Sequence, residues 1–160
     1  MSAIVLVDTS VFLNVLDVPG FNQDRDTVLE EFERRIRLGQ HFLLPMATVW
    51  ETGNHIARLS SGGLRRDYAS RLVAQVKLAV TGEAPYRATY LPERDEFLTW
   101  IEEFPDYAMR NKSATKTNCG VSLADLSIIK EWERTCSIHS MSRVLIWSLD
   151  DDLAGYDSHA

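Results

Sequence analysis

The chain opens with an apolar run, Ala3 to Val7, that leads directly into Asp8-Thr9-Ser10. An uninterrupted apolar run indicates a strand buried on both faces, as in the centre of a parallel sheet. Asp8 then lies at the carboxyl end of that strand, where open α/β sheets bind their ligands. The alternative is a structural one, because Asp, Ser and Thr all cap helices and a helical segment follows.

Three further segments are expected to be strands, and helical patterns separate them. The run 41–44 ends at Pro45, the segment 86–91 suits an edge strand, and the run 144–149 ends in three aspartates. Helices are expected at 25–38, 46–59, 64–82, 92–104 and from 119 onward. Because parallel strands need crossover helices, this alternation predicts an α/β sandwich with a parallel sheet.

The segment 92–104 begins with Pro92, which favours the first position of a helix. Phe97, Trp100, Ile101 and Phe104 recur there at helical spacing, so we expect them to lie in the core. Pro105 is expected to end this helix.

Length and composition set the class of protein. With 160 residues, the chain is expected to form one domain over 1–160. No window approaches the roughly 18 apolar residues of a membrane span, and the N-terminus lacks the basic lead of a signal peptide. Cys119 and Cys136 lack the spacing of a zinc site, so a reduced, cytoplasmic setting is expected.

The net charge of −6 argues against a protein that coats nucleic acid through bulk electrostatics. It does not exclude nucleic acid as a substrate. An enzyme that gathers carboxylates around a divalent cation offsets their charge with the metal itself. The positions of the acids are therefore more informative than their number.

Three more acids occupy positions like that of Asp8. Glu51 lies in the first turn of the helix after the second strand, Asp125 at a helix start, and Asp150 after the last strand. Thr48 and Ser122 lie three residues before Glu51 and Asp125, so each of these acids fits a capping box with a purely local role. Independent helix caps would not be expected to place four acids at the same predicted sheet edge.

Carboxylates that converge in one cleft raise each other's pKa values unless a cation is present. Mg²⁺ or Mn²⁺ prefers oxygen ligands, polarises phosphate and activates water. With neither zinc-type histidines nor a nucleophilic cysteine, this set of acids suggests metal-assisted phosphodiester hydrolysis.

Four short motifs of the chain resemble the acidic motifs of PIN-domain nucleases, in order and at sensible separations. They are Val7-Asp8-Thr9-Ser10-Val11-Phe12, Glu51, Leu123-x-Asp125-x-x-Ile128-Ile129 and Ser148-Leu149-Asp150. The match spans nearly the whole chain. In length and single-domain layout the chain is similar to toxin ribonucleases of the VapC type.

The resemblance implies a three-layer α/β/α sandwich with four to five parallel strands ordered 3-2-1-4-5, and endonucleolytic cleavage of RNA with Mg²⁺ or Mn²⁺. It also implies a cognate antitoxin and a homodimer. The implied catalytic acids are Asp8, Glu51, Asp125 and Asp150, the metal ligands Asp8, Asp125 and Asp150, and the supporting hydroxyls Ser10 and Ser148. Asp152 is a further metal-site acid, since the run from Asp150 permits more than one register.

The polar segment 110–118 leads into the helix that carries Asp125. It is expected to be a loop whose Lys112 and Lys116 lie near that acid and bind the RNA substrate. A solvated loop is the structural alternative.

Two other functions fit an apolar strand that ends in an acid. A phosphatase or phosphotransferase with an aspartyl-phosphate needs a second Asp at the position of Ser10, which this chain lacks. A PIN fold that serves as a binding or assembly module, without significant nuclease activity, is the stronger alternative. Leu64 and Tyr68, on the helical hairpin, are candidates for a partner surface under either reading.

Overall fold

The structure, a computed structural model, describes residues 2–159. Four parallel strands form one sheet with the order β3-β2-β1-β4, which confirms the predicted α/β fold. The strands are β1 (Ala3–Val7), β2 (His41–Leu44), β3 (Tyr86–Ala88) and β4 (Arg143–Trp147).

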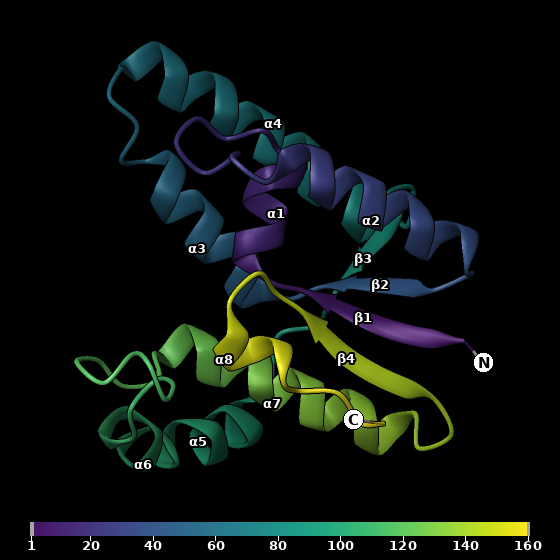
Figure 1. Cartoon of the computed structure of the whole chain (residues 1–160), viewed down its shortest axis with the longest axis vertical. Coiled ribbons are helices and arrows are strands. Elements are labelled where there is room, and N and C mark those ends of the chain that lie inside the picture. The colour runs from purple at the N-terminus through teal and green to yellow at the C-terminus, as the bar shows by residue number, and fades with distance from the viewer. Residues whose placement is uncertain (1, 160) are drawn as a thin grey trace.

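The first strand lies at the centre of the sheet, as its apolar sequence predicted. All five residues of β1 are buried. The strand pairs with β2 on one side and with β4 on the other, in a register that places Val7 opposite Trp147. All four strands run toward the same edge in Figure 1. The segments that follow them are therefore gathered at one side of the molecule.

Helices cover both faces of the sheet (Figure 1). The helices α1 to α4 lie on one side, and α5 to α8 lie on the other. Their bounds are α1 (Thr9–Val15), α2 (Arg25–Arg37), α3 (Met46–Ile56), α4 (Gly62–Thr81), α5 (Arg94–Glu102), α6 (Phe104–Met109), α7 (Leu123–Ile138) and α8 (Asp151–Ala154).

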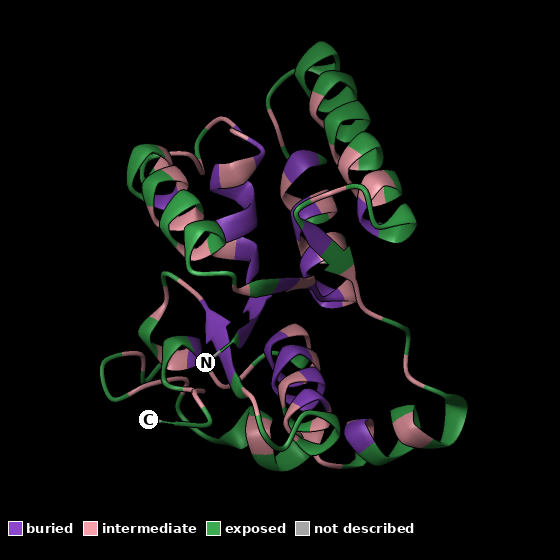
Figure 2. Cartoon of the chain, turned by 90° about the vertical axis from the view of Figure 1, so that its right-hand side faces the viewer, coloured by how far each residue is buried: buried purple, intermediate pink, exposed green. Residues whose placement is uncertain are grey.

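The two core clusters follow from the alternation of side chains along the strands. Val5 and Val7 face one cluster, whereas Ile4 and Leu6 face the other. Buried residues accordingly concentrate in the sheet and in the helices packed directly on it (Figure 2). A central strand buried in this way has no polar face, which explains why its sequence is continuously apolar.

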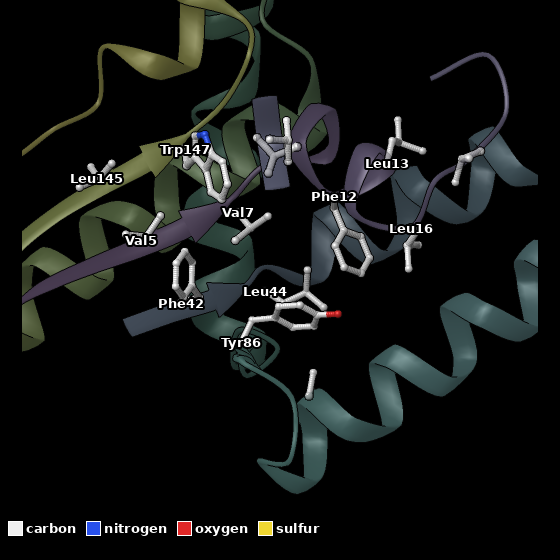
Figure 3. Close-up of a cluster of buried hydrophobic side chains, with 14 of the residues drawn as sticks. Val5, Val7, Phe12, Leu13, Leu16, Phe42, Leu44, Tyr86, Leu145 and Trp147 are labelled. Atoms are coloured by element: carbon white, nitrogen blue, oxygen red, sulfur yellow. The ribbon is translucent and has the colours of Figure 1, made fainter. Parts of the chain in front are cut away.

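The larger cluster contains aromatic contacts that join the sheet to the first helical layer. Phe12 meets the ring of Tyr86 edge-on, with centroids 5.6 Å apart, and Phe42 meets Phe32 at 4.7 Å. Figure 3 shows Phe12 reaching from α1 toward Tyr86 and Leu44. Helix α1 is thus fixed directly after β1, which holds the turn at Asp8 in place.

The segment 92–104 differs from the prediction. Its helix begins at Arg94, and Phe104 and Pro105 belong to a further short helix, α6, with Pro105 in the first turn. A proline lacks the N–H that a first turn does not use, so it starts this helix rather than merely ending the previous one. Trp100 is buried as expected, but Phe97 is 46% exposed, so its assignment to the core was wrong.

The ends of the sheet are shorter than the sequence suggested. Only three residues of the segment 86–91 form β3. In place of a fifth strand, Asp157 makes an isolated antiparallel bridge to Leu145. Within residues 2–159, no helix has the combined length and apolar character needed to cross a membrane.

A buried acid joins α7 to the segment that follows β3. Glu131 is 2% exposed, and its Oε1 accepts hydrogen bonds from the Thr89 hydroxyl and from Arg134. Its Oε2 has no hydrogen-bond partner within the described residues. Burial raises the pKa of Glu131 to about 7, against the smaller opposing effects of Thr89 and Arg134.

This raised pKa predicts a pH-dependent stability. The folded chain retains the proton of Glu131 to a higher pH than the unfolded chain, so the free energy of unfolding falls as pH rises from about 4.5 to about 7. Relative to Glu131→Gln, the wild type should lose on the order of 3 kcal/mol across that window. Urea denaturation of both proteins at pH 4.5, 6 and 8 measures this. A constant difference between them would contradict the assignment.

Candidate functional site

A cavity of about 460 Å³ opens where the strands end, and we call it the acidic cavity. Five carboxylates line it. One of them, Asp24, directly precedes α2 and was not predicted, and the other four come from four separate segments. Asp8 follows β1, Glu51 lies on α3, Asp125 on α7, and Asp150 precedes α8. The structure thus brings together the four acids that the sequence analysis singled out.

Asp8 is the most enclosed of these acids, with 3% of its surface exposed. Its Oδ2 accepts hydrogen bonds from Ser148 Oγ at 2.7 Å and from Ser10 Oγ at 2.8 Å. Asp8 occupies the N-cap position of α1, yet its side chain makes no capping hydrogen bond. Burial raises the pKa of Asp8, and the two hydroxyls oppose this by stabilising the ionised form. The Asp8 carboxylate therefore lines the acidic cavity and does not cap α1.

The two serines also position the backbone around the site. Ser10 Oγ accepts from the N–H of Leu149 at 3.0 Å, and Ser148 Oγ accepts from the N–H of Asp150 at 3.0 Å. The bond from Leu149 joins the turn after β1 to the turn after β4, and the bond from Asp150 lies within the turn after β4. Ser10 and Ser148 accordingly fix Asp150 relative to Asp8.

Glu51 is oriented by a neighbour of Asp8. Thr9 Oγ1 donates to Glu51 Oε2 at 2.8 Å. The alternative capping box with Thr48 does not form, because the Thr48 hydroxyl donates to the carbonyl of Val7 at 2.8 Å. Burial raises the pKa of Glu51, and the negative charges of Asp125 and Asp8 raise it further.

Asp125 combines a local role with a place in the site. Its N–H donates to Ser122 Oγ at 3.0 Å, so half of the expected capping box is present. Its side chain reaches the acidic cavity, where Lys112 Nζ lies 3.2 Å from Oδ2. This contact is an ion pair, and within residues 2–159 the buried Oδ2 has no polar neighbour that bonds to it apart from Lys112. Burial raises the pKa of Asp125, whereas Lys112 acts to lower it.

The two lysines of the segment 110–118 fold back onto the acids. Lys112 Nζ lies 3.7 Å from Asp152 Oδ2, and Lys116 Nζ lies 3.2 Å from Asp152 Oδ1 and 3.7 Å from Asp150 Oδ1. Burial acts to lower the pKa of Lys112, but Asp125 and Asp152 outweigh it and the pKa is raised. Asp152 thus contacts both lysines but is not among the residues that line the acidic cavity.

The chemistry of these groups fits a hard divalent cation. The donors are carboxylate oxygens, the ligands that Mg²⁺ and Mn²⁺ prefer, and in the described part of the chain the buried Asp125 Oδ2 is neutralised only by Lys112. Within residues 2–159, however, no three His, Cys, Asp or Glu side chains are already grouped closely enough to bind an ion. Lys112 and Lys116 supply positive charge among them instead.

The sequence analysis missed several residues of the cavity. Asn14 lines it and is buried, with Nδ2 donating to the carbonyl of Ser10 at 2.9 Å and Oδ1 accepting from the N–H of Asp24 at 3.1 Å. Its position one helical turn after Ser10 was the available signal. His55 also lines the cavity, and burial lowers its pKa. No comparable sequence signal marked His55.

No family model matches the sequence, and comparisons with curated proteins and with solved structures likewise returned no match. The interpretation of the site therefore rests on the residues of this chain.

The raised pKa of Asp8 predicts that Asp8→Asn does not destabilise the fold at pH 7. The ionised carboxylate is the form that burial disfavours, and an Asn oxygen can accept the same two hydroxyls. We expect the variant to have an equal or higher free energy of unfolding at pH 7. This advantage should shrink as pH falls and the wild-type acid gains its proton. A loss of more than about 1 kcal/mol at pH 7 would instead indicate a structural cap.

Proposed function

We propose that this chain is a metal-dependent endoribonuclease that hydrolyses RNA phosphodiester bonds at the acidic cavity. The observation that carries the proposal is the convergence of Asp8, Glu51, Asp125 and Asp150 on one cavity of about 460 Å³. Independent helix caps do not account for it, since Asp8 and Glu51 accept hydroxyl hydrogen bonds across separate elements or turns. The resemblance of the motifs to those of PIN-domain nucleases supports RNA as the substrate.

Electrostatics favours a cation at this position. The pKa values of Asp8, Glu51 and Asp125 are all raised by burial, so the ionised forms are held at an energetic disadvantage. Binding of a divalent ion would relieve this disadvantage, and it is coupled to loss of the carboxyl protons. When bound, Mg²⁺ or Mn²⁺ supplies Lewis-acid polarisation of the phosphate and lowers the pKa of a water molecule.

Metal binding, orientation of the carboxylates and proton acceptance are assigned to different residues. In the proposal Asp8, Asp125 and Asp150 hold the metal, with Asp152 as an additional acid, while Ser10 and Ser148 fix the orientation of Asp8. Glu51 accepts the proton of the attacking water at Oε1, the P–O bond to the leaving oxygen breaks, and the leaving oxygen takes a proton from solvent. Thr9 occupies Oε2 and thereby sets the orientation of the Glu51 carboxylate.

Lys112 and Lys116 neutralise the acids before substrate arrives and bind the RNA afterward. Their ammonium groups lie within 3.2 to 3.7 Å of carboxylate oxygens that the proposal assigns to the metal. Once the metal supplies that charge, the lysines can bind phosphates instead. The polar segment 110–118 is then part of the substrate path.

The biological setting follows from the resemblance to toxin ribonucleases of the VapC type. We propose a cytoplasmic toxin that pairs with a small antitoxin protein and forms a homodimer. These assignments depend on the nuclease activity and are tested after it.

One observation favours the alternative of a binding module without nuclease activity. Within the described residues the acids are paired with lysines and no three ligands are grouped for a metal. A module of this kind would keep the ion pairs permanently. The nuclease reading predicts instead that added Mn²⁺ displaces the lysines and binds the acids.

Cleavage assays test the proposal directly. We expect a panel of structured and unstructured RNAs to be cut only with Mg²⁺ or Mn²⁺, and Asp8→Asn to lower the rate by on the order of 10³-fold, equivalent to about 4 kcal/mol of transition-state stabilisation. Asp67→Asn is the matched control, because Asp67 is exposed on α4. Cleavage without metal, or full activity in Asp8→Asn, would contradict the mechanism.

Neutralising both lysines of the loop tests the substrate path. Lys112→Gln with Lys116→Gln should weaken RNA binding and reduce the slope of log affinity against log salt by about 1.4, the contribution of two contacts to single-stranded phosphate. Arg71→Gln with Lys77→Gln on the exposed surface of α4 is the control. An unchanged slope would remove the loop from the substrate path.

A further inference from the structure

A second cavity, of about 700 Å³, lies beside the acidic cavity, and we call it the apolar cavity. It is lined by residues of α3, α5 and α7, among them Trp50, Phe97, Trp100, Leu123 and Glu131. Glu51 lines both cavities. The two cavities are therefore neighbours that share Glu51.

The lining of the apolar cavity contains exposed aromatic side chains. Trp50 is 58% exposed, and Phe97 is exposed beside it on the same cavity. Exposed aromatic side chains around a cavity of this size are typical of a ligand site. Arg94, also exposed, adds a cation to the lining. Aromatic rings with one cation match a base and its phosphate.

One residue of the lining carries an acceptor without a partner among the described residues. Glu131 lines the cavity, and its Oε2 is buried without a hydrogen-bond partner in the described part of the chain. Its Oε1 already accepts from Thr89 and Arg134, which hold the carboxylate in place. A buried carboxylate oxygen without a donor is rare in folded proteins, and once Glu131 is ionised an N–H or O–H group of a ligand would satisfy it.

We propose that the apolar cavity binds a guanine base of the nucleotide next to the scissile phosphate, with Glu131 accepting its N–H groups and Trp50 stacking on its ring. The link to cleavage rests on the proposed nuclease function. Trp50 and Glu51 both line the apolar cavity, and Glu51 also lines the acidic cavity, which places the base site next to the carboxylates.

The choice of guanine follows from the donors on its Watson–Crick edge. An ionised carboxylate only accepts hydrogen bonds. Guanine presents two neighbouring N–H donors, from N1 and N2. Adenine and cytosine each place one amino group beside an unprotonated ring nitrogen, and uracil places one N–H between two carbonyl oxygens, so each brings a second acceptor against Glu131. An apolar peptide side chain would leave Oε2 without a donor.

Nucleotide binding in the absence of divalent metal tests this assignment apart from catalysis. We would titrate the protein with GMP, AMP, CMP and UMP in EDTA at pH 8, above the raised pKa of Glu131, and follow binding by NMR chemical shifts. GMP should bind at least tenfold more tightly than the other three. Glu131→Gln should reduce that preference to less than threefold, and Trp50→Ala should weaken GMP binding about tenfold.

Two controls separate a binding role from a structural one. Glu133→Gln changes an acid of the same helix that is not part of the cavity lining, and it should leave the preference unchanged. Trp50 is exposed, so its variant tests the site even if Glu131→Gln fails to fold.

Equal affinity for the four nucleotides, or a guanine preference that survives Glu131→Gln, would overturn the assignment. So would binding of an apolar peptide with no nucleotide binding. Because the titration contains no metal, guanine binding by a protein that cuts no RNA would uphold the cavity assignment and overturn the nuclease. Metal-dependent cleavage by a protein with no preference for guanine would uphold the nuclease and overturn the cavity assignment.

Discussion

The burial of β1 on both faces is the constraint on which the rest of the structure depends. A strand between β2 and β4 under two helical layers has to be apolar throughout, and its first polar residue then falls at the sheet edge. The N–H of Asp8 continues the ladder by donating to the carbonyl of Trp147 at 3.0 Å. The position of the Asp8 carboxylate is therefore set by the same hydrogen bonds that hold the sheet together.

Stability and function are opposed at this edge. Carboxylates that are buried together raise one another's pKa values, and the fold tolerates them through hydroxyl hydrogen bonds and the two lysines. A divalent cation would satisfy the same charges more completely. The lysine pairs and a bound metal are thus alternative ways to neutralise one site, and the proposed nuclease depends on exchange between them.

Short sequence patterns predicted the strands and the helix starts that depend on neighbouring residues alone. The apolar runs gave three of the strands with nearly correct bounds, and the positions of Asp8, Glu51, Asp125 and Asp150 at strand ends and helix starts predicted their convergence. Such patterns could not predict contacts between segments that are distant in sequence. Thr48 bonds to Val7 rather than to its own helix, and Phe97 faces a cavity formed with α3 and α7 rather than the core. The unpartnered oxygen of Glu131 likewise emerges only from the packing.

Binding of Mn²⁺, followed by calorimetry and by the electron paramagnetic resonance of the ion, tests the central claim most directly. If Asp8, Asp125 and Asp150 form one metal site, the wild type should bind Mn²⁺ with release of protons, and Asp125→Asn should weaken that binding at least tenfold, whereas exposed Asp67→Asn should not. A wild type that binds no Mn²⁺, or that binds it equally well without the Asp125 carboxylate, would contradict the account.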